Sequence, residues 1–278
     1  MKPAKLDVKS TTLAKDLYDS LANTGFAVLT NHGIDQQLLK DVYAEWEGFF
    51  DYSGKMEYKA AHGGASGFFP MKSENAKGFN VKDLKEFFHL FYPYRNIPEG
   101  MTFSTAVLAT DLDSLGQQLL VCIDSEYEKR NKEYLCLSEM ADQSKNTLFR
   151  ILHYPPLPLD AEEGAVRAAP HEDINLITLL PSATFPGLAV KDNEGQWHLI
   201  DSDEGEIIVN VGDMLMEATG GKLKSTTHKV LNPTGLGAKH SRYSMPLFVH
   251  AHPETRISER YTAGEYLDER LKEIGLKV

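Results

Sequence analysis

The chain has 278 residues and a hydrophobic fraction of 42%, which supports a sizeable core in one large domain or two small ones. It carries 29 basic and 40 acidic residues, a formal net charge of −11, which disfavours nucleic acid and anionic membranes as partners. Its two cysteines, Cys122 and Cys136, form neither a disulfide framework nor a CxxC metal pair. The N-terminus lacks the apolar run of a signal peptide and no stretch approaches the length of a membrane span, so we expect a cytoplasmic protein.

The first fifty residues predict a helix, a strand and a second helix. Thr11 or Thr12 can cap a helix that carries leucines at i, i+4 spacing and ends by Gly25. Phe26–Thr30 predicts a short buried strand. Asp35 can cap the second helix, whose apolar face is expected to consist of Leu38, Leu39, Val42, Trp46 and Phe49.

The middle of the chain adds one strand and two helices. The glycine-rich segment His62–Gly67 lacks the spacing of a phosphate-binding loop and predicts a mobile loop. The aromatic run Lys85–Tyr92 predicts a strand. Apolar residues at helical spacing predict the longest helix over Thr102–Arg130, where Gly116 is tolerated, and a short helix is expected near Leu137–Ser144.

After Leu148 the pattern changes to short apolar runs separated by Pro, Gly and Asn, which is typical of a sandwich or jelly roll. A final helix is expected near Ala263–Ile274. No Pro/Ser-rich linker divides the chain, so we expect a mainly β protein with flanking helices and one unit, 1–278. Its parts would be a helix-rich segment 1–146 packed on a barrel, a core 147–250 and a C-terminal helical segment 251–278. The expected strands of the core are Leu148–Tyr154, Ile174–Leu180, Gly187–Lys191, Trp197–Asp201, Glu206–Val211, Thr226–Leu231 and Tyr243–His250.

Three residues predict a metal centre. His171 and Asp173 are two apart in or beside a strand, so their side chains project to the same face. His228 can complete the set after several intervening strands. Two imidazoles and a carboxylate leave three octahedral positions open, the facial triad of non-heme Fe(II) oxygenases, whereas zinc prefers tetrahedral closure. His250 and His252 form a similar pair without a nearby carboxylate, and we interpret them as exposed or packing histidines.

A second pair points to a co-substrate. Arg242 and Ser244 are also two apart on a predicted strand and share a face. Facing sheets pack roughly 10 Å apart, a gap that a small dicarboxylate can bridge between the metal and Arg242. The alternative is a surface arginine beside a strand serine, which the preceding metal motif disfavours. His32, in a turn, is interpreted as structural.

Ordered motifs along nearly the whole chain resemble those of the isopenicillin N synthase-like family of Fe(II)/2-oxoglutarate-dependent dioxygenases. That family has the double-stranded β-helix, or jelly-roll, fold. The resembling segments are Gly25–Ile34, Asp83–His89, His153–Pro156, His171–Asp173 with Leu176–Leu180, Asn210–Asp213, Lys224–Val230 and Arg242–Ser244.

The resemblance implies that His171, Asp173 and His228 bind iron and support catalysis. It implies 2-oxoglutarate and O2 as co-substrates, and ascorbate as an accessory reductant. Residues implied to hold the 2-oxoglutarate tail are Arg242, Ser244 and, in an assisting role, Tyr154. Plant members often carry asparagine two positions before that tyrosine; Leu152 stands there in this chain, so one polar contact to the co-substrate is absent.

We therefore expect an oxygenase that oxidises an unactivated C–H bond of a small molecule, by hydroxylation in the first instance. An oxidase or cyclase of the same fold that does not use 2-oxoglutarate is one alternative, and a non-catalytic ligand-binding jelly roll is another. The sequence does not identify the substrate. Segments expected to line its pocket are Gly63–Lys77 and Lys85–Tyr92, with Phe68, Phe69, Lys72 and His89 as candidate contacts.

Overall fold

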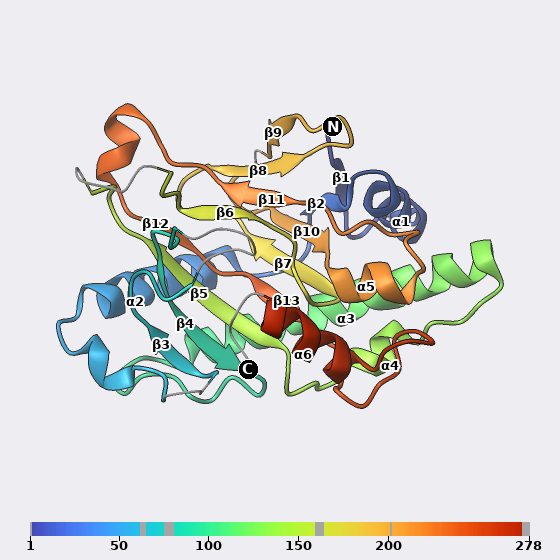
Figure 1. Ribbon diagram of the computed structural model, residues 1–278, viewed down its shortest axis with the longest axis horizontal. Coiled ribbons are helices and arrows are strands. Elements are labelled where there is room, and N and C mark those ends of the chain that lie inside the picture. The colour runs from blue at the N-terminus through green and yellow to red at the C-terminus, as the bar shows by residue number, and fades with distance from the viewer. Residues whose placement is uncertain (1, 62–64, 75–80, 159–163, 201, 274–278) are drawn as a thin grey trace.

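Two β-sheets form the centre of the fold (Figure 1). The computed structural model describes residues 2–61, 65–74, 81–158, 164–200 and 202–273. The larger sheet contains, in spatial order, β1 (Ala4–Asp7), β2 (Phe26–Thr30), β10 (Ile207–Val211), β7 (Ile177–Pro181), β13 (Leu247–Val249), β5 (Leu148–Tyr154), β4 (Glu86–Phe91) and β3 (Gly67–Phe69), with β12 (Arg242–Ser244) also paired to β5. The smaller sheet contains β6 (Ala168–His171), β11 (His228–Val230), β8 (Leu188–Lys191) and β9 (Trp197–Leu199).

Apolar contacts hold the two sheets face to face. One cluster joins β2 and β10 of the larger sheet to β8 of the smaller one, and a second joins β4 and β5 to β6 and β11. This arrangement confirms the predicted mainly β architecture with flanking helices. The first cluster consists of Phe26, Val28, Leu188, Val190, Ile200 and Ile208, and the second of Phe87, Leu152, Tyr154, Ala168 and Val230.

The helices contribute to a large core on the other side of the larger sheet. α3 (Ser104–Asn131) packs against β7 and β13, and Gly116 allows this close approach. A Cβ atom at Gly116 would lie 3.1 Å from Val249 Cγ2 and 3.3 Å from Leu179 Cδ1, so a side chain there would push helix and sheet apart. The other helices are α1 (Leu13–Thr24), α2 (Gln36–Asp51), α4 (Leu137–Ala141), α5 (Asp213–Ala218) and α6 (Ala263–Glu273), with 3-10 turns η1 (Lys55–Tyr58) and η2 (Gly235–Lys239).

The predicted helix ends can be compared with the observed ones. The Asp35 carboxylate accepts a hydrogen bond from the Gln37 backbone N–H at 2.8 Å and so caps α2 as predicted. Gly25 ends α1 with φ of 75°, a conformation that favours glycine. Thr12 stands at the N-cap of α1, but its hydroxyl donates to the Asp16 carboxylate instead of bonding the backbone.

Some predicted boundaries were wrong. The expected strand Tyr243–His250 is two strands, β12 and β13, separated by Met245 and Pro246, because proline has no N–H to donate to a ladder. The expected strand Ile174–Leu180 begins only at Ile177. The short strand β6 was not predicted. Parts of four predictions lie outside the described residues: 62–64 of the glycine-rich loop, 63–64 and 75–77 of the expected pocket segment Gly63–Lys77, residue 201 and residue 274.

α3 also corrects the expectation that no stretch approaches the length of a membrane span. It has 28 residues, and its most apolar 18-residue window has a mean hydropathy of 1.2, enough by length and composition for a span. Leu108, Leu112 and Leu119 on this helix are fully buried in the core. Packing within this fold therefore accounts for part of its apolar composition.

Candidate metal centre

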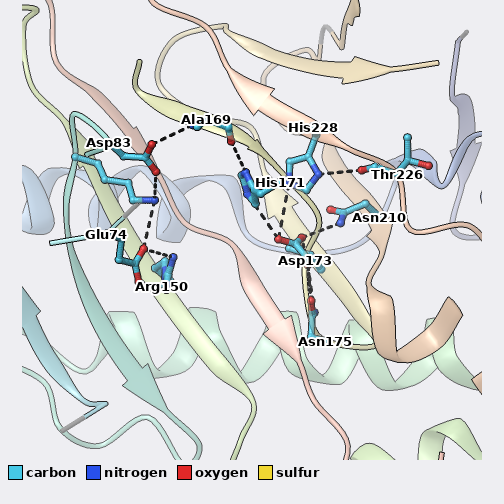
Figure 2. Close-up of polar contacts among 12 residues, drawn as sticks. Glu74, Asp83, Arg150, Ala169, His171, Asp173, Asn175, Asn210, Thr226 and His228 are labelled. Atoms are coloured by element: carbon cyan, nitrogen blue, oxygen red, sulfur yellow. Dashed lines mark hydrogen bonds and ion pairs between the residues drawn. The ribbon is translucent and has the colours of Figure 1, made fainter. Parts of the chain in front are cut away.

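Strand pairing brings the predicted metal ligands together. His171, the last residue of β6, is the direct partner of His228, the first residue of β11. Asp173 lies two residues beyond β6 and turns back toward both histidines (Figure 2). One ligand atom from each of the three residues lies within 4.8 Å of the others, a spacing that can hold one metal ion.

A β-bulge shapes the strand that carries His171. His171 pairs with His228 and Ala168 pairs with Val230, so two residues of β6 stand opposite one residue of β11. A bulge changes the direction of the side chains that follow it. Asp173 also lies beyond the end of β6, so strict alternation along a strand, the basis of the sequence prediction, does not by itself explain how His171 and Asp173 converge.

Both imidazoles present the same nitrogen to the site. His171 Nδ1 lies 2.7 Å from the Ala169 carbonyl, and His228 Nδ1 lies 3.2 Å from the Thr226 carbonyl. A carbonyl only accepts, so each Nδ1 carries the proton and each Nε2 keeps a lone pair. The Nε2 atoms of His171 and His228 lie 4.0 and 3.7 Å from Asp173 Oδ1. The three free lone pairs thus face one point.

Asp173 is held by one of its two carboxylate oxygens. Oδ2 accepts hydrogen bonds from the Thr178 hydroxyl at 2.6 Å and from the Asn210 amide at 2.8 Å, which leaves Oδ1 to the metal position. Thr178 and Asn210 are direct partners in the β7–β10 ladder. Such outer contacts orient metal ligands. The sequence motifs contained both residues, but their role was not predicted.

The electrostatics favour the protonation states that a metal requires. Burial and the neighbouring His228 lower the pKa of His171 to about 4, so the imidazole is neutral near pH 7. Burial opposes ionisation of Asp173, but the two histidines and the hydrogen bonds from Asn210 and Thr178 outweigh it and lower its pKa. Neutral histidine and ionised carboxylate are the forms that bind a divalent metal.

The turn that carries Asp173 is clamped by the chain around Gly212. The Asp213 N–H donates to the Asp173 carbonyl at 2.7 Å, and the Gly212 N–H donates to the Leu176 carbonyl at 2.9 Å. A Cβ atom at Gly212 would lie 2.1 Å from the Asn175 carbonyl oxygen, closer than any side chain tolerates. Glycine is thus required here for the contact that fixes the turn.

Arg242 lies in the same cavity as a buried cation. It is only 2% exposed, and its Nε donates to the Phe185 carbonyl at 2.8 Å. Its Nη1 has no partner, and no carboxylate pairs with it among the residues that the structure describes. Burial lowers the pKa of Arg242, opposed by Tyr154 and Tyr43, yet a guanidinium stays charged in proteins. A buried, unpaired charge of this kind calls for an anionic ligand.

One cavity between the two sheets is lined by every residue that the sequence predicted for the metal and 2-oxoglutarate sites. Tyr154 is the ladder partner of Arg242, and Leu152 is the partner of Ser244. The Arg242 guanidinium lies 5.2 Å from the centre of the Tyr154 ring. Lys85, Arg150 and Phe248 also line the cavity. The predicted residues among its lining are His171, Asp173, His228, Arg242, Ser244 and Tyr154.

Comparison with known proteins gives the family. Residues 145–251 match the model of the 2OG-Fe(II) oxygenase superfamily, and residues 3–104 match that of the non-haem dioxygenase in morphine synthesis N-terminal region. The chain is 30% identical to the proline hydroxylase buaE of Petromyces alliaceus, over 95% of this chain and 93% of the relative. The chain belongs to the 2OG-Fe(II) oxygenase superfamily.

Solved structures of this superfamily share the fold. A Shewanella oneidensis protein provisionally classed as an oxygenase is 44% identical, covers 99% of both chains and superposes with a TM-score of 0.85. A full-length Neurospora crassa protein solved in complex with alpha-KG has a TM-score of 0.78 at 22% identity, over 96% of this chain and 95% of that one. These likenesses confirm the predicted jelly-roll fold of the oxygenase.

The four candidate substrate contacts, Phe68, Phe69, Lys72 and His89, lie outside the cavity between the two sheets. Phe68 is buried in the main core, and Phe69 stacks on Phe87 with centroids 4.8 Å apart. His89 lies behind Arg150 and accepts a hydrogen bond from its Nε at 2.7 Å. Of the expected segment Lys85–Tyr92, Lys85 itself lines the cavity, and His89 acts on the cavity wall only through Arg150 of β5.

The remaining histidines named above lie outside the triad. His32 Nε2 contacts the Gly205 carbonyl at 2.8 Å, and His252 Nε2 contacts the Asp142 carbonyl at 2.7 Å. His250 is buried, and its Nδ1 has no partner among the described residues. These positions agree with the structural and packing roles that the sequence indicated.

Proposed function

We propose that His171, Asp173 and His228 bind Fe(II), and that Arg242, Ser244 and Tyr154 bind the tail of 2-oxoglutarate. The protein would then oxidise an unactivated C–H bond of a small molecule, with hydroxylation as the outcome. The observation that carries this proposal is one cavity that contains both a ligand triad and a buried arginine without a counterion. A dicarboxylate with a keto acid end satisfies both.

Each residue has a separate task in this mechanism. When bound, iron, 2-oxoglutarate and O2 supply the oxidation, which converts 2-oxoglutarate to succinate and CO2 and places one oxygen atom of O2 in the substrate. The two imidazoles and one Asp173 oxygen would hold the metal, a ligand set that suits Fe(II). Arg242 offers two parallel N–H groups to a carboxylate, which fixes its orientation. The burial of Arg242 and Ser244 excludes water from that contact.

The substrate is proposed to occupy the end of the cavity that Lys85, Arg150 and Phe248 line. Arg150 lies on the same face of β5 as Leu152 and Tyr154, four residues from the tyrosine that meets Arg242. Related proteins named proline hydroxylase, or solved with thymine, act on or bind small molecules, which supports a small organic substrate here. A reducing cytoplasm would keep the iron as Fe(II) and the two free cysteines reduced.

Titration of the anaerobic Fe(II) protein with 2-oxoglutarate tests the proposal. We expect a metal-to-ligand charge-transfer band that saturates with one equivalent, and succinate formation after O2 is admitted. Arg242→Leu is the matched variant: iron should still bind while the band requires far more 2-oxoglutarate. Iron binding without any band would contradict the use of 2-oxoglutarate and favour an oxidase of the same fold.

A further inference from the structure

The bulge in β6 leaves the backbone of Ala169 outside the ladder with β11. Ala168 and His171 have partners in β11, but Ala169 and the proline that follows it have none there. The Ala169 N–H and carbonyl are therefore free to bond elsewhere, and both are buried with the residue. Buried backbone groups require partners. The partners of the Ala169 backbone are Asp83 and the candidate metal ligand His171.

Asp83 supplies the missing acceptor. Its Oδ1 accepts a hydrogen bond from the Ala169 N–H at 3.1 Å, and the Ala169 carbonyl accepts one from His171 Nδ1 at 2.7 Å (Figure 2). The next residue, Leu84, is fixed as well, because its N–H donates to the Val166 carbonyl at 2.9 Å. A chain of two hydrogen bonds thus runs from the Asp83 carboxylate through one residue to the imidazole.

We propose that Asp83 is a positioning residue for His171, an inference that rests on the proposed role of His171 as an iron ligand. The Ala169 carbonyl holds the Nδ1 proton and so directs Nε2 to the metal. The direction of the Ala169 carbonyl is fixed only if the backbone of the bulge is fixed. The hydrogen bond from the Ala169 N–H to Asp83 holds this backbone in place of the absent ladder bonds. His228 needs no such anchor, because its strand β11 lies between β6 and β8 and His228 has a ladder partner in each of them.

The anchor is itself held by an ion-pair network. Lys85 Nζ lies 2.9 Å from Asp83 Oδ2 and 3.3 Å from Glu74 Oε2. Glu74 accepts both Nη groups of Arg150 at 3.2 and 3.3 Å. Burial opposes ionisation of Glu74, but Arg150 and Lys85 outweigh it and lower its pKa to about 2. The charges of one lysine and one arginine therefore offset those of two carboxylates, which makes the buried cluster neutral overall.

The cluster also offers a matched pair of substitutions. Asp83→Asn keeps the shape, but the Lys85 ammonium can only donate and its charge-assisted bond holds the amide oxygen, so the amide NH2 group faces the Ala169 N–H and that contact is lost. Glu74→Gln weakens the same network at a carboxylate that does not touch β6. Both changes remove one buried negative charge beside Lys85. Asp83→Asn also disturbs the backbone that orients His171, whereas Glu74→Gln disturbs the bonds to Arg150 instead.

The test is Fe(II) affinity, measured anaerobically by equilibrium titration without substrate. We expect Asp83→Asn to weaken Fe(II) binding by about 10- to 100-fold, the range for changes in residues that orient metal ligands, and Glu74→Gln to change it less than about twofold. Equal affinities in Asp83→Asn and the unmodified protein, or equal losses in the two variants, would overturn the proposal. Absence of Fe(II) binding in the unmodified protein would instead contradict the proposed function.

A second measurement separates positioning from general stability. In the Co(II)-substituted protein, the Nδ1 protons of His171 and His228 should give two paramagnetically shifted, exchangeable NMR signals. Lys85→Met retains the Asp83–Ala169 bond but removes the ammonium that holds Asp83. In this variant the His171 Nδ1 proton should exchange with solvent faster than it does in the unmodified protein, while the exchange rate of the His228 proton stays the same. Equal exchange of both protons, slow or fast, would assign Asp83 a purely structural role and overturn the inference.

Discussion

His171 and His228 face each other across the β6–β11 ladder, with ring centroids 4.4 Å apart and planes tilted by 54°. The backbone pairing of two distant segments therefore brings two candidate ligands together, and the turn after β6 adds Asp173. The ladder and the hydrogen bonds to Asp173 position these three side chains through contacts within the chain. We therefore expect the surrounding sheets to be independent of the candidate ligands.

Replacement of His171 by alanine tests this independence. We expect His171→Ala to abolish Fe(II) binding and turnover while the fold is retained, since His171 is partly exposed and its core neighbours stay packed. Circular dichroism and the thermal unfolding midpoint of the metal-free protein report the fold, and iron titration reports the site. Normal iron binding and turnover in the variant would show that His171 is not a ligand.

The contact with the co-substrate predicts a graded effect at Arg242 and Ser244. Arg242→Lys should raise the dissociation constant for 2-oxoglutarate about 10- to 100-fold, because lysine cannot reproduce two parallel charge-assisted bonds worth about 1.5–3 kcal/mol. Ser244→Ala removes a neutral donor and should cost about 0.5–1.5 kcal/mol. Titration of the charge-transfer band measures both. A larger effect of Ser244→Ala than of Arg242→Lys would contradict the proposed binding mode.

The sequence predicted secondary structure well where the residues of one segment are enough to determine it. Strand β5 matches its predicted bounds, and the cap at Asp35 lies as expected. Features that depend on partners far along the chain were missed. β6 is a strand because β11 pairs with it, and its bulge contains Pro170, which argues against a strand in isolation. The break at Pro246 follows from a change of neighbours, since β12 pairs with β5 alone and β13 with both β5 and β7.

The candidate metal ligands could be predicted for a related reason. The residue types in the motif indicate which side chains can bind a metal, and the family resemblance supplied the order of the motifs along the chain. The surroundings of the ligands were not readable. Thr178 and Asn210 reach Asp173 because their strands are in register, and Asp83 reaches Ala169 because a bulge exposes its N–H. Both depend on the register of strand pairs, which one sequence does not reveal.

Gly212 offers a test of the clamp on Asp173. Gly212→Ala should weaken Fe(II) binding and lower the unfolding midpoint by several degrees, because its Cβ would lie 2.1 Å from the Asn175 carbonyl and force the turn to move. Gly48→Ala is the control. Its Cβ would meet nothing within 4 Å, and alanine favours the helix α2 that contains it. Iron affinity unchanged in Gly212→Ala would mean that the turn adapts without moving Asp173.

The N-terminal segments are predicted to be needed for a stable barrel. β2 pairs directly with β10, and helices α1 to α3 share the main core with β7 and β13. We propose that the chain folds as one unit, so a fragment that begins at Thr147 should be insoluble or unfolded when expressed alone. Proteolysis and circular dichroism of that fragment check this. A folded, active fragment would show that the N-terminal part is a separate domain.

The buried His250 predicts how the stability of the metal-free protein depends on pH. Burial lowers the pKa of His250 from 6.5 to about 4, opposed by the charge of Asp173. The unfolded chain therefore binds a proton at higher pH than the folded chain does, and folding stability is lost as the pH falls from about 6.5 to about 4. His171 and His89, with pKa values lowered to about 4 and about 3, act in the same direction.

Replacement of His250 should remove the contribution of this residue to the pH dependence of the unfolding free energy. Urea unfolding of the metal-free protein between pH 7 and pH 4.5 should show a smaller slope of unfolding free energy in His250→Leu, by up to about 1.4 kcal/mol per pH unit for one proton. His171, His89 and carboxyl groups whose pKa is lowered, such as Glu74 and Asp173, should contribute to the slope that remains. The absolute stability of the variant is not the criterion, because leucine also changes packing. Identical slopes in variant and unmodified protein would show that His250 takes up its proton equally in the folded and unfolded chains.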